Sequence, residues 1–261
     1  VVYKPASGTP LSAVKLVEIF EEAGLPPGVL NLVTGPGGSV GNTLVEDPRV
    51  KGISFTGSTE IGTAVTARGS ELLKKVQCEM GGKNAAIILN DADLEKAVPG
   101  VVQGAFGSTG QRCTATSRVI VENGIYDEFM KNLIDQTKAL SIGDGMNESN
   151  DVAPLSSKNQ LDTVLRYIGV GTEEGAHLTF GGHQLQEDKF ADGYYIEPTI
   201  FTDVDPEMRI AKEEIFGPVL SVFKVSNLKE AVNISNNVDF GLSSSVYTRD
   251  LVQAYEYINS A

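Results

Sequence analysis

The chain has 261 residues, of which 41% are hydrophobic and 21% charged, a balance typical of globular proteins and not of disordered ones. Its formal net charge of −13 at pH 7 would repel a phosphate backbone, which argues against nucleic acid as a partner. No apolar run approaches the roughly 20 residues that a membrane-spanning helix needs, so we expect no membrane partner either.

Cysteine and histidine are both scarce. Cys78 and Cys113 are the only cysteines, too few for a secreted disulfide framework, and a reducing, cytoplasmic setting fits better. With only two histidines, no metal-ligand spacing appears, and we expect no metal site. The chain lacks an initial Met, starts on a strand-like run and stops inside a helix-like one, so we expect it to be part of a longer polypeptide.

Strand-like and helix-like runs alternate at short intervals as far as Cys78. Strands are expected at residues 1–5, 29–33, 52–55 and 72–78, and helices begin at Thr9-Pro10, Gly41 and Thr59. This alternation predicts a parallel sheet with crossover helices, an architecture that suits nucleotide binding. We expect the first strand to be buried, Thr9 to cap its helix and Cys78 to be a core side chain.

A glycine pair, Gly81-Gly82, interrupts this pattern, and we place a domain boundary there, between residues 1–80 and residues 81–261. Beyond it, strands are expected at residues 84–89, 118–121, 177–180, 195–201, 219–225 and 245–247, with helices ending near residues 106, 140, 169, 234 and 258. Residues 181–193 are expected to form a polar hairpin or loop. The second part is therefore another α/β unit.

Two features of the first part suit a phosphate-bearing ligand. Thr56-Gly57-Ser58 stands between a strand and a helix, where exposed N–H groups and the helix dipole attract anions. Its spacing is not GxGxxG, so a dinucleotide site here would be a variant, and the alternative is an ordinary capped turn. Lys4 ends the first strand and could reach a ribose or phosphate there, or it could simply be solvated.

Three further stretches carry candidate chemistry. Glu79 precedes Gly81-Gly82 and could act as a general base, the alternative being a surface carboxylate at a turn. Cys113 lies in the polar stretch Gly107–Arg118, where Arg112 and a helix N-terminus would favour the thiolate, so a nucleophile fits better than a core cysteine. Glu214 and Phe216 precede a Gly-Pro turn and could hold a ribose and flank a cofactor ring, or could end a helix with an exposed charge pair.

The order of these motifs resembles that of the NAD(P)-dependent aldehyde dehydrogenase superfamily, from one end of the chain to the other. The stretches that carry the resemblance are Lys4-Pro5-Ala6, Phe55 to Gly62, Glu79 to Lys83, Gly110 to Cys113, and Glu213 to Pro218. The resemblance implies an α/β fold in which residues 1–80 complete a Rossmann-type dinucleotide-binding domain and residues 81–261 form most of a catalytic thiol domain. It also implies a homodimer or homotetramer.

The resemblance further implies oxidation of an aldehyde to a carboxylic acid with NAD or NADP, through a thiohemiacetal and a thioester. Cys113 matches the nucleophile and Glu79 the general base. The implied cofactor contacts are Lys4, Ser7, Gly37, Gly41, Gly57, Ser58, Glu214 and Phe216. Two alternatives stay open: a thioester or ester hydrolase without redox chemistry, and a fold-retaining protein without activity.

Two positions bear on specificity within the family. Ser7 stands where members often have a Glu that binds the adenosine ribose, and a neutral residue there predicts that NADP is accepted. Arg112 directly precedes the residue that matches the nucleophile. The sequence around it resembles that of the branch acting on semialdehydes of dicarboxylic acids, such as 2-oxoglutaric or succinic semialdehyde. The Arg112 guanidinium could bind a substrate carboxylate, or it could form a structural ion pair instead.

Overall fold

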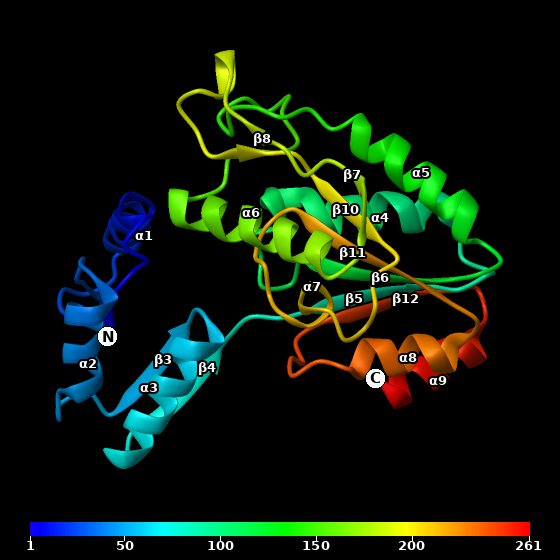
Figure 1. Ribbon diagram of the computed structural model, residues 1–261. Helices are drawn as coiled ribbons and strands as arrows, with labels where there is room; N and C mark the ends of the chain where they lie inside the picture. The colour runs from blue at the N-terminus through cyan, green and yellow to red at the C-terminus, as the bar shows by residue number, and fades with distance from the viewer. The chain divides into compact units, whose positions relative to one another are not determined.

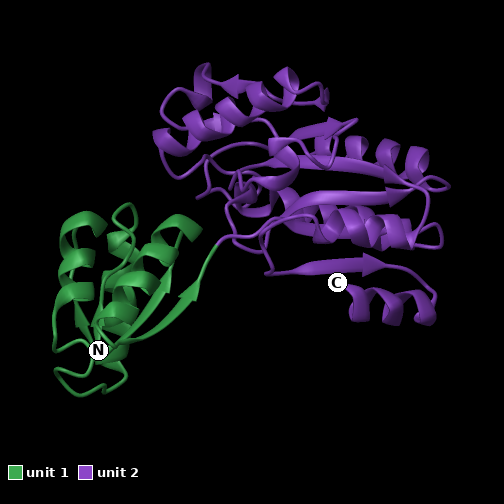
Figure 2. Cartoon of the chain, turned by 60° about the horizontal axis from the view of Figure 1, so that its bottom comes forward, with its two compact units in different colours: residues 1–80 green, residues 81–261 purple.

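The computed structural model describes residues 1–261 and divides them into two compact units, Val1–Met80 and Gly81–Ala261 (Figures 1 and 2). Strands and helices alternate in both, so the α/β class expected from the sequence is confirmed. None of the helices combines the length and the apolar character needed to cross a bilayer.

The N-terminal unit consists of two β-α-β crossovers joined by a helical connection. Its elements are β1 (Val2–Tyr3), α1 (Pro10–Glu22), β2 (Asn31–Leu32), the π-helical turn η1 (Gly37–Gly41), α2 (Asn42–Glu46), β3 (Gly52–Thr56), α3 (Thr59–Glu71) and β4 (Lys75–Glu79). β1 pairs with β2 and β3 with β4, both in parallel, as the crossover pattern predicted. The strands form two separate pairs and not one sheet.

Two of the helix starts in this unit are as the sequence predicts, whereas one expected cap and one expected strand start are wrong. Pro10 opens α1 and Ser58 caps α3, its Oγ accepting a hydrogen bond from the Ile61 N–H at 3.4 Å. The expected cap by Thr9 is wrong, because its side chain makes no capping hydrogen bond. The strand expected from residue 72 starts only at Lys75, because α3 continues to Glu71 and a left-handed residue follows it.

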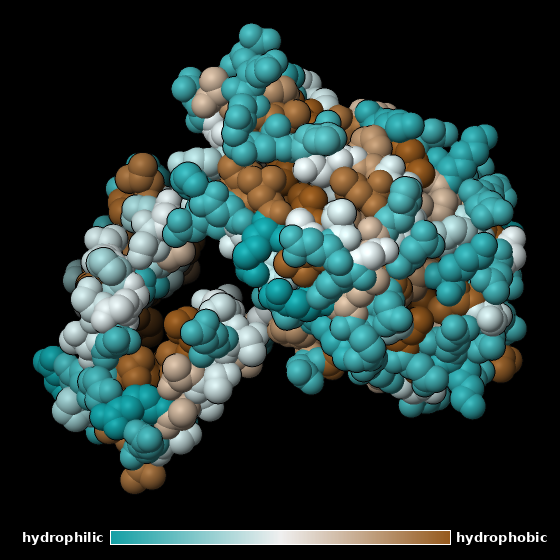
Figure 3. Space-filling model, in the orientation of Figure 1, coloured by the Kyte–Doolittle hydropathy of each residue, from teal (hydrophilic) through white to brown (hydrophobic).

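Burial in the N-terminal unit is lower than expected. Val2 in β1 is 45% exposed, so the expectation of a buried first strand is wrong. Cys78 is partly exposed and its Sγ lies 3.3 Å from Thr66 Oγ1, so the core assignment is wrong as well. Each strand pair has only one crossover helix of its own, which leaves apolar side chains of the unit at its surface, where Figure 3 shows brown patches.

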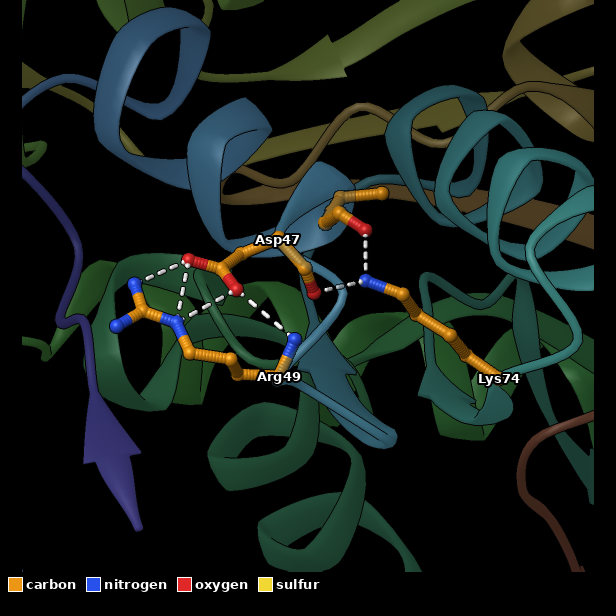
Figure 4. A network of polar contacts seen from close by, with 4 residues as sticks. Asp47, Arg49 and Lys74 are labelled. Atoms are coloured by element: carbon orange, nitrogen blue, oxygen red, sulfur yellow. Dashed lines mark hydrogen bonds and ion pairs between the residues drawn. The ribbon is translucent and has the colours of Figure 1, made fainter.

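A polar network fixes the end of α2 against the turn between α3 and β4 (Figure 4). Lys74 Nζ donates to the backbone oxygens of Val45 and Asp47, the latter at 2.8 Å. Val45 is in the last turn of α2 and Asp47 directly follows that helix, so the ammonium lies at the helix C-terminus, where the helix dipole favours a cation. Arg49 Nη2 lies 2.6 Å from Asp47 Oδ2, and this guanidinium holds the pKa of the Asp47 carboxyl well below its usual range.

The C-terminal unit is built on a six-stranded sheet in the order β12-β5-β6-β11-β10-β7, parallel except for β7. The strands are β5 (Asn84–Ile88), β6 (Thr116–Glu122), β7 (His177–Phe180), β10 (Thr199–Thr202), β11 (Val219–Val225) and β12 (Ser244–Tyr247). The helices are α4 (Leu94–Phe106), α5 (Tyr126–Lys138), α6 (Lys158–Glu173), α7 (Arg209–Lys212), α8 (Leu228–Asn236) and α9 (Leu251–Ser260).

Helices cover both faces of this sheet, and alternate strand residues join two separate cores. Ile88 packs with α4 and α5 on one face, whereas Ile87 packs with α6 and α8 on the other. Every residue of β5 is buried, as expected of a parallel strand covered on both sides.

The single strand expected over residues 195–201 is wrong. Pro198 cannot donate to a ladder, and the run is divided there into β9 (Tyr195–Ile196) and β10. β9 instead pairs antiparallel with β8 (Gln184–Leu185), so a hairpin does form in the region expected to be a polar hairpin or loop.

Candidate active site

Three candidate segments of the C-terminal unit lie at one edge of its sheet. Gly81-Gly82 leads into β5, Cys113 shortly precedes β6, and Glu214 to Pro218 lead into β11. β5, β6 and β11 are adjacent and parallel, so their amino ends share an edge. Ligands of open parallel sheets usually bind at the carboxyl ends of the strands, so this location differs from the usual one.

Cys113 is exposed and lies in a tight turn before β6. The turn is closed by a hydrogen bond from the Ala115 N–H to the Arg112 oxygen at 3.0 Å. Asn84 Nδ2 donates to the backbone oxygens of Cys113 and Ala115, at 2.8 and 2.9 Å. Hydrogen bonds from Asn84 therefore hold the backbone of the turn, while Cys113 itself stays exposed to solvent.

The expected helix N-terminus beside Cys113 is absent. The chain leaves α4 through the 3-10 turn η2 (Gly107–Gly110), in which Ser108, Thr109 and Gly110 all have left-handed φ angles of 53°, 57° and 66°. Thr109 is 1% exposed and its hydroxyl donates to the Ala153 oxygen at 2.8 Å. Left-handed residues other than glycine are costly, so packing against neighbouring segments must hold this turn in place.

Arg112 is engaged by the end of α4. Its Nη2 donates to the backbone oxygens of Gln103 and Gly104, at 2.9 and 3.3 Å, which are among the last carbonyl groups of that helix. This contact favours a structural role over binding of a substrate carboxylate. It also differs from the ion pair considered from the sequence, because the partners are carbonyl oxygens.

Glu214 is half-buried against the glycine pair. Its Oε1 accepts a hydrogen bond from the Gly82 N–H at 3.1 Å. Burial raises the pKa of the Glu214 carboxyl, and the Gly82 N–H and the nearby Lys83 partly offset this. A methyl group at Gly81 would lie 2.1 Å from Glu214 Oε2, and one at Gly82 would lie 3.0 Å from the Cys113 oxygen. The glycines are thus required by close packing on both candidate residues.

Phe216 lies on the same loop and is 39% exposed, with a left-handed φ of 56°. Gln160 Nε2 donates to the oxygens of Ile215 and Phe216, at 2.8 and 3.0 Å, and so holds this conformation. A methyl group at Gly110 would lie 2.2 Å from the Gly217 oxygen, so η2 packs directly on the loop. A small pocket lined by Gly82, Arg112, Glu214 and Phe216 among others lies here.

Two basic side chains near the glycine pair, those of Lys83 and Arg118, are buried. Lys83 is 2% exposed and its Nζ has no hydrogen-bond partner. Burial, with a contribution from Arg118, lowers the pKa of Lys83 to about 7. Arg118 is 3% exposed and donates to the oxygens of Lys83, Ile234 and Ser235, at 2.8–2.9 Å.

Glu79 ends β4 in the N-terminal unit and its side chain is exposed. Its backbone oxygen accepts from the Gly57 N–H at 3.1 Å, so the main chain of Glu79 is next to the turn that leads into α3. A methyl group at Gly57 would lie 2.6 Å from the Phe55 ring, which explains glycine there. Ser58 uses its hydroxyl as the α3 cap.

Lys4 and Ser7 converge on one carbonyl group of the same unit. Lys4 Nζ donates to the Pro5 and Gly35 oxygens, at 2.6 and 3.2 Å, and Ser7 Oγ donates to the Gly35 oxygen at 3.1 Å. Gly41 lies against the Lys4 side chain, and the surroundings of Gly37 are open. Lys4, Ser7 and η1 therefore form one cluster at the carboxyl end of β1.

Each unit by itself offers groups that suit part of a nucleotide. In the C-terminal unit, the half-buried Glu214 can accept hydrogen bonds from a ribose. In the N-terminal unit, the N-terminus of α3 can meet phosphate oxygens. No group of three or more His, Cys, Asp or Glu side chains is arranged to hold a metal ion.

Asn84, Lys83, Arg118 and Gln160 were not predicted as site residues from the sequence. Each is a polar residue whose position in the fold gives it its role, and three of the four are buried. The signal available for Asn84 was a polar residue at the head of an entirely apolar strand. For Lys83 and Arg118, a charge next to buried strand residues was the corresponding signal.

Comparison with known proteins places these observations in a family. The model of the "Aldehyde dehydrogenase family" matches residues 1–261. An alpha-ketoglutaric semialdehyde dehydrogenase of Bacillus subtilis is 51% identical over 99% of this chain and 53% of its own length, and an alpha-ketoglutarate semialdehyde dehydrogenase of Haloferax volcanii is 42% identical with the same coverage.

A solved structure agrees with these relatives. The NAD-dependent aldehyde dehydrogenase from Sinorhizobium meliloti superposes with a TM-score of 0.96 at 39% identity, over 100% of this chain and 51% of that one. The chain thus spans about half the length of the relatives it matches. It belongs to the aldehyde dehydrogenase family.

Proposed function

We propose that this chain is the part of an NAD(P)-dependent aldehyde dehydrogenase that carries the nucleophile, the general base and several cofactor contacts. The observation that carries the proposal is the exposed thiol of Cys113 on a backbone-fixed turn, at the sheet edge where the half-buried Glu214 also lies. Family membership over all 261 residues supports it.

We propose the following chemistry for Cys113, Glu79 and the cofactor, as the family resemblance implies it. The Cys113 thiolate attacks the aldehyde carbon, a C–S bond forms, and the aldehyde oxygen becomes an oxyanion that the Cys113 N–H can stabilise. NAD or NADP, when held with its nicotinamide ribose on Glu214, would supply the hydride acceptor, and loss of that hydride would leave the substrate as a thioester of Cys113. Glu79 then takes a proton from water, whose oxygen attacks the thioester carbon and releases the carboxylic acid and the thiolate.

The cofactor is proposed to be NAD or NADP. Residues 1–80 would supply part of the dinucleotide-binding domain, with Lys4 and Ser7 near the adenosine ribose, Gly37, Gly41, Gly57 and Ser58 near the phosphates. Residues 81–261 would form most of the catalytic domain, with Glu214 on the nicotinamide ribose and Phe216 beside the ring. The name of the Sinorhizobium meliloti enzyme supports NAD, whereas the neutral Ser7 supports acceptance of NADP.

The substrate is proposed to be a semialdehyde that carries a carboxylate, with 2-oxoglutaric semialdehyde as the first candidate. The names of the Bacillus subtilis and Haloferax volcanii relatives support this choice. Because the Arg112 guanidinium donates to α4, its part in binding that carboxylate is the weaker of its two proposed roles. Equal losses toward acidic and neutral aldehydes in Arg112→Ala would fit the structural role.

The test is a substrate panel with the whole protein and both cofactors, followed by the absorbance of NAD(P)H. We expect 2-oxoglutaric semialdehyde to be oxidised with a higher kcat/KM than betaine aldehyde, and Cys113→Ala to abolish the reaction. Release of an acid from esters or thioesters, with no NAD(P)H formed from any aldehyde, would contradict the proposal and favour a hydrolase. No turnover of either kind by the folded whole protein would favour a protein without activity.

We also infer that the whole protein is a homodimer or homotetramer in a reducing, cytoplasmic setting. Exposed apolar side chains on α9, including Leu251, Val252 and Ile258, support association, and the two unpaired cysteines support reduction. Light scattering on the purified whole protein measures the first, and fractionation of the cell measures the second. A monomer, or a protein found outside the cytoplasm, would contradict these inferences.

A further inference from the structure

We propose that Asn84 is the positioning residue of the nucleophile turn, an inference that rests on the proposed role of Cys113. The Asn84 side chain makes three hydrogen bonds to backbone groups. Nδ2 donates to the oxygens of Cys113 and Ala115, at 2.8 and 2.9 Å, and Oδ1 accepts from the Ser243 N–H at 3.0 Å. All three hydrogen bonds thus join the Asn84 side chain to the main chain of other segments.

The two carbonyl groups held by Asn84 constrain the direction of the Cα–Cβ bond that carries the thiol. Each Cα lies between two peptide planes, and the Cys113 oxygen belongs to the plane that follows its Cα. The Ala115 oxygen marks the end of the same turn, which the Ala115 N–H closes on the Arg112 oxygen. With these positions fixed, the Cα–Cβ bond of Cys113 and its own N–H have little freedom. Both groups take part in the proposed attack on the aldehyde.

The surroundings keep Asn84 itself in place. It is 5% exposed, and its own backbone oxygen accepts a hydrogen bond from the Ser117 hydroxyl at 3.3 Å. The pairing of β5 with β6 shifts here, from Asn84 opposite Thr116 to Ala85 opposite Arg118, so Ser117 is an extra residue. Such a bulge redirects the chain locally and is common beside active sites. The amide therefore faces the turn and not a regular ladder.

The glycine before Lys83 gives Asn84 its access to the turn. A methyl group at Gly82 would lie 2.8 Å from Asn84 Oδ1 and 3.0 Å from the Cys113 oxygen, so any larger residue would separate the two groups. The Gly82 N–H is held by Glu214 and the Lys83 oxygen by Arg118. The segment from Gly82 to Asn84 is consequently fixed at three successive residues.

The alternative is that Asn84 only satisfies carbonyl groups that would otherwise be buried without partners. In that case its loss would lower stability and nothing else. A positioning role predicts a different result: loss of Asn84 would slow the attack by Cys113 and leave the cofactor affinity unchanged. The rate at which the thiol reacts can be measured with and without substrate.

The experiment compares Asn84→Ala and Asn84→Ser in the whole protein with Asn31→Ala as the matched control. Asn31 Nδ2 likewise donates to two carbonyl groups, those of Val1 and Gly28, but it lies in β2. Three quantities are measured: the rate of the first burst of NAD(P)H, the KM for the cofactor, and the rate of Cys113 alkylation by iodoacetamide across pH.

We expect Asn84→Ala to slow the burst at least about tenfold, since small displacements of a reacting group can cost about a hundredfold. Its cofactor KM should stay within about twofold of that of the parent. The serine hydroxyl can still donate one hydrogen bond, so Asn84→Ser should recover part of the rate. Asn31→Ala should leave all three quantities unchanged.

A burst at the parental rate in Asn84→Ala, or equal changes in burst rate and cofactor KM, would overturn the proposal. If Asn84→Ala does not fold, the same criteria apply to Asn84→Ser. Alkylation separates this inference from the proposed function. If no aldehyde is oxidised, an alkylation rate and pH profile altered by Asn84→Ser but not by Asn31→Ala still supports positioning, whereas unaltered alkylation rejects it.

Discussion

The Glu214 carboxylate accepts a hydrogen bond from the Gly82 N–H at 3.1 Å, across 132 residues of sequence. This contact joins the loop before β11 to the segment that leads into β5, and it fixes one carboxylate oxygen while leaving the other free. The free oxygen of this half-buried carboxylate can accept a hydrogen bond from a ribose hydroxyl group. The neighbouring Gly81 determines whether that geometry is available.

Gly81→Ala is expected to weaken cofactor binding. The added methyl group would lie 2.1 Å from Glu214 Oε2 and 2.5 Å from its Cδ, so the carboxylate has to move. We expect the cofactor KM to rise about tenfold, or about 1.4 kcal/mol, with a smaller effect on kcat. Steady-state kinetics at varied cofactor concentration measures both.

Gly169→Ala is the control for this change, because Gly169 lies in α6 with no atom within 4 Å of the added carbon. It should match the parent in both constants. An unchanged cofactor KM in Gly81→Ala would show that Glu214 does not bind the cofactor in this way.

Glu79→Gln is expected to separate the two halves of the reaction. Gln cannot take a proton from water, whereas attack by Cys113 and hydride transfer do not need the Glu79 carboxylate in the proposed sequence. We expect a first burst of NAD(P)H close to that of the parent and a steady-state rate at least about a hundredfold lower. Rapid mixing followed by absorbance measures the two phases.

Glu95→Gln, an exposed change on α4, serves as the control and should leave both phases unchanged. If Glu79→Gln lost the burst and the steady state equally, the carboxylate would be needed before hydrolysis, and its role as the base for water would be wrong.

Much of the fold could be predicted because the local signals agree with the tertiary structure. The β-α-β alternation, Pro10 at the start of α1 and the capped start of α4 depend on neighbouring residues and could be recognised from them. The burial of each strand could not be predicted, because it depends on which other elements cover the strand. Cys78 shows this, since its alternating run is typical of a core strand but β3 and β4 have only α3 beside them.

The candidate site divides in the same way. The role of Cys113 was predicted from its polar neighbours, whereas those of Glu79 and Glu214 were predicted from the family resemblance, and all three stay predictions. Asn84 could be found only from structure, since its proposed function depends on the bulge between β5 and β6. The location of the candidate segments at the amino ends of β5, β6 and β11 could not be predicted either. Strand order is not encoded locally, and ligands of parallel sheets usually bind at the carboxyl ends.

Ser7→Glu is expected to move cofactor preference away from NADP. Ser7 is exposed, and its hydroxyl donates to the Gly35 oxygen beside Lys4. A carboxylate there would repel a 2′-phosphate and could accept from ribose hydroxyls, so the KM for NADP should rise about tenfold while that for NAD stays or falls. Kinetics with both cofactors measures the ratio.

An exposed serine elsewhere in the same unit, Ser70, gives the control variant Ser70→Glu, which should keep the parental ratio. A strong preference for NAD in the parent that Ser7→Glu leaves unchanged would show that position 7 does not select the cofactor.

Lys83→Met is expected to stabilise the protein by an amount that depends on pH. Burial lowers the pKa of Lys83 from 10.5 to about 7, with Arg118 lowering it and Glu214 and Glu213 opposing this. Between these two values the unfolded chain holds a proton that the folded chain has lost, so the stability of the parent rises with pH in this window and falls as pH drops toward 7. Met has no proton to gain, and its side chain fills similar space.

The advantage of Lys83→Met over the parent should therefore be largest near pH 7 and shrink as pH rises toward 10.5, by up to about 1.4 kcal/mol per pH unit. Denaturant unfolding at pH 7 and pH 9 measures the free energies of unfolding, and the control is Lys131→Met at an exposed position of α5. The control should show a difference that does not change with pH. A Lys83→Met variant less stable than the parent by the same amount at both pH values would mean that the Lys83 side chain contributes through packing alone and that folding does not change its protonation.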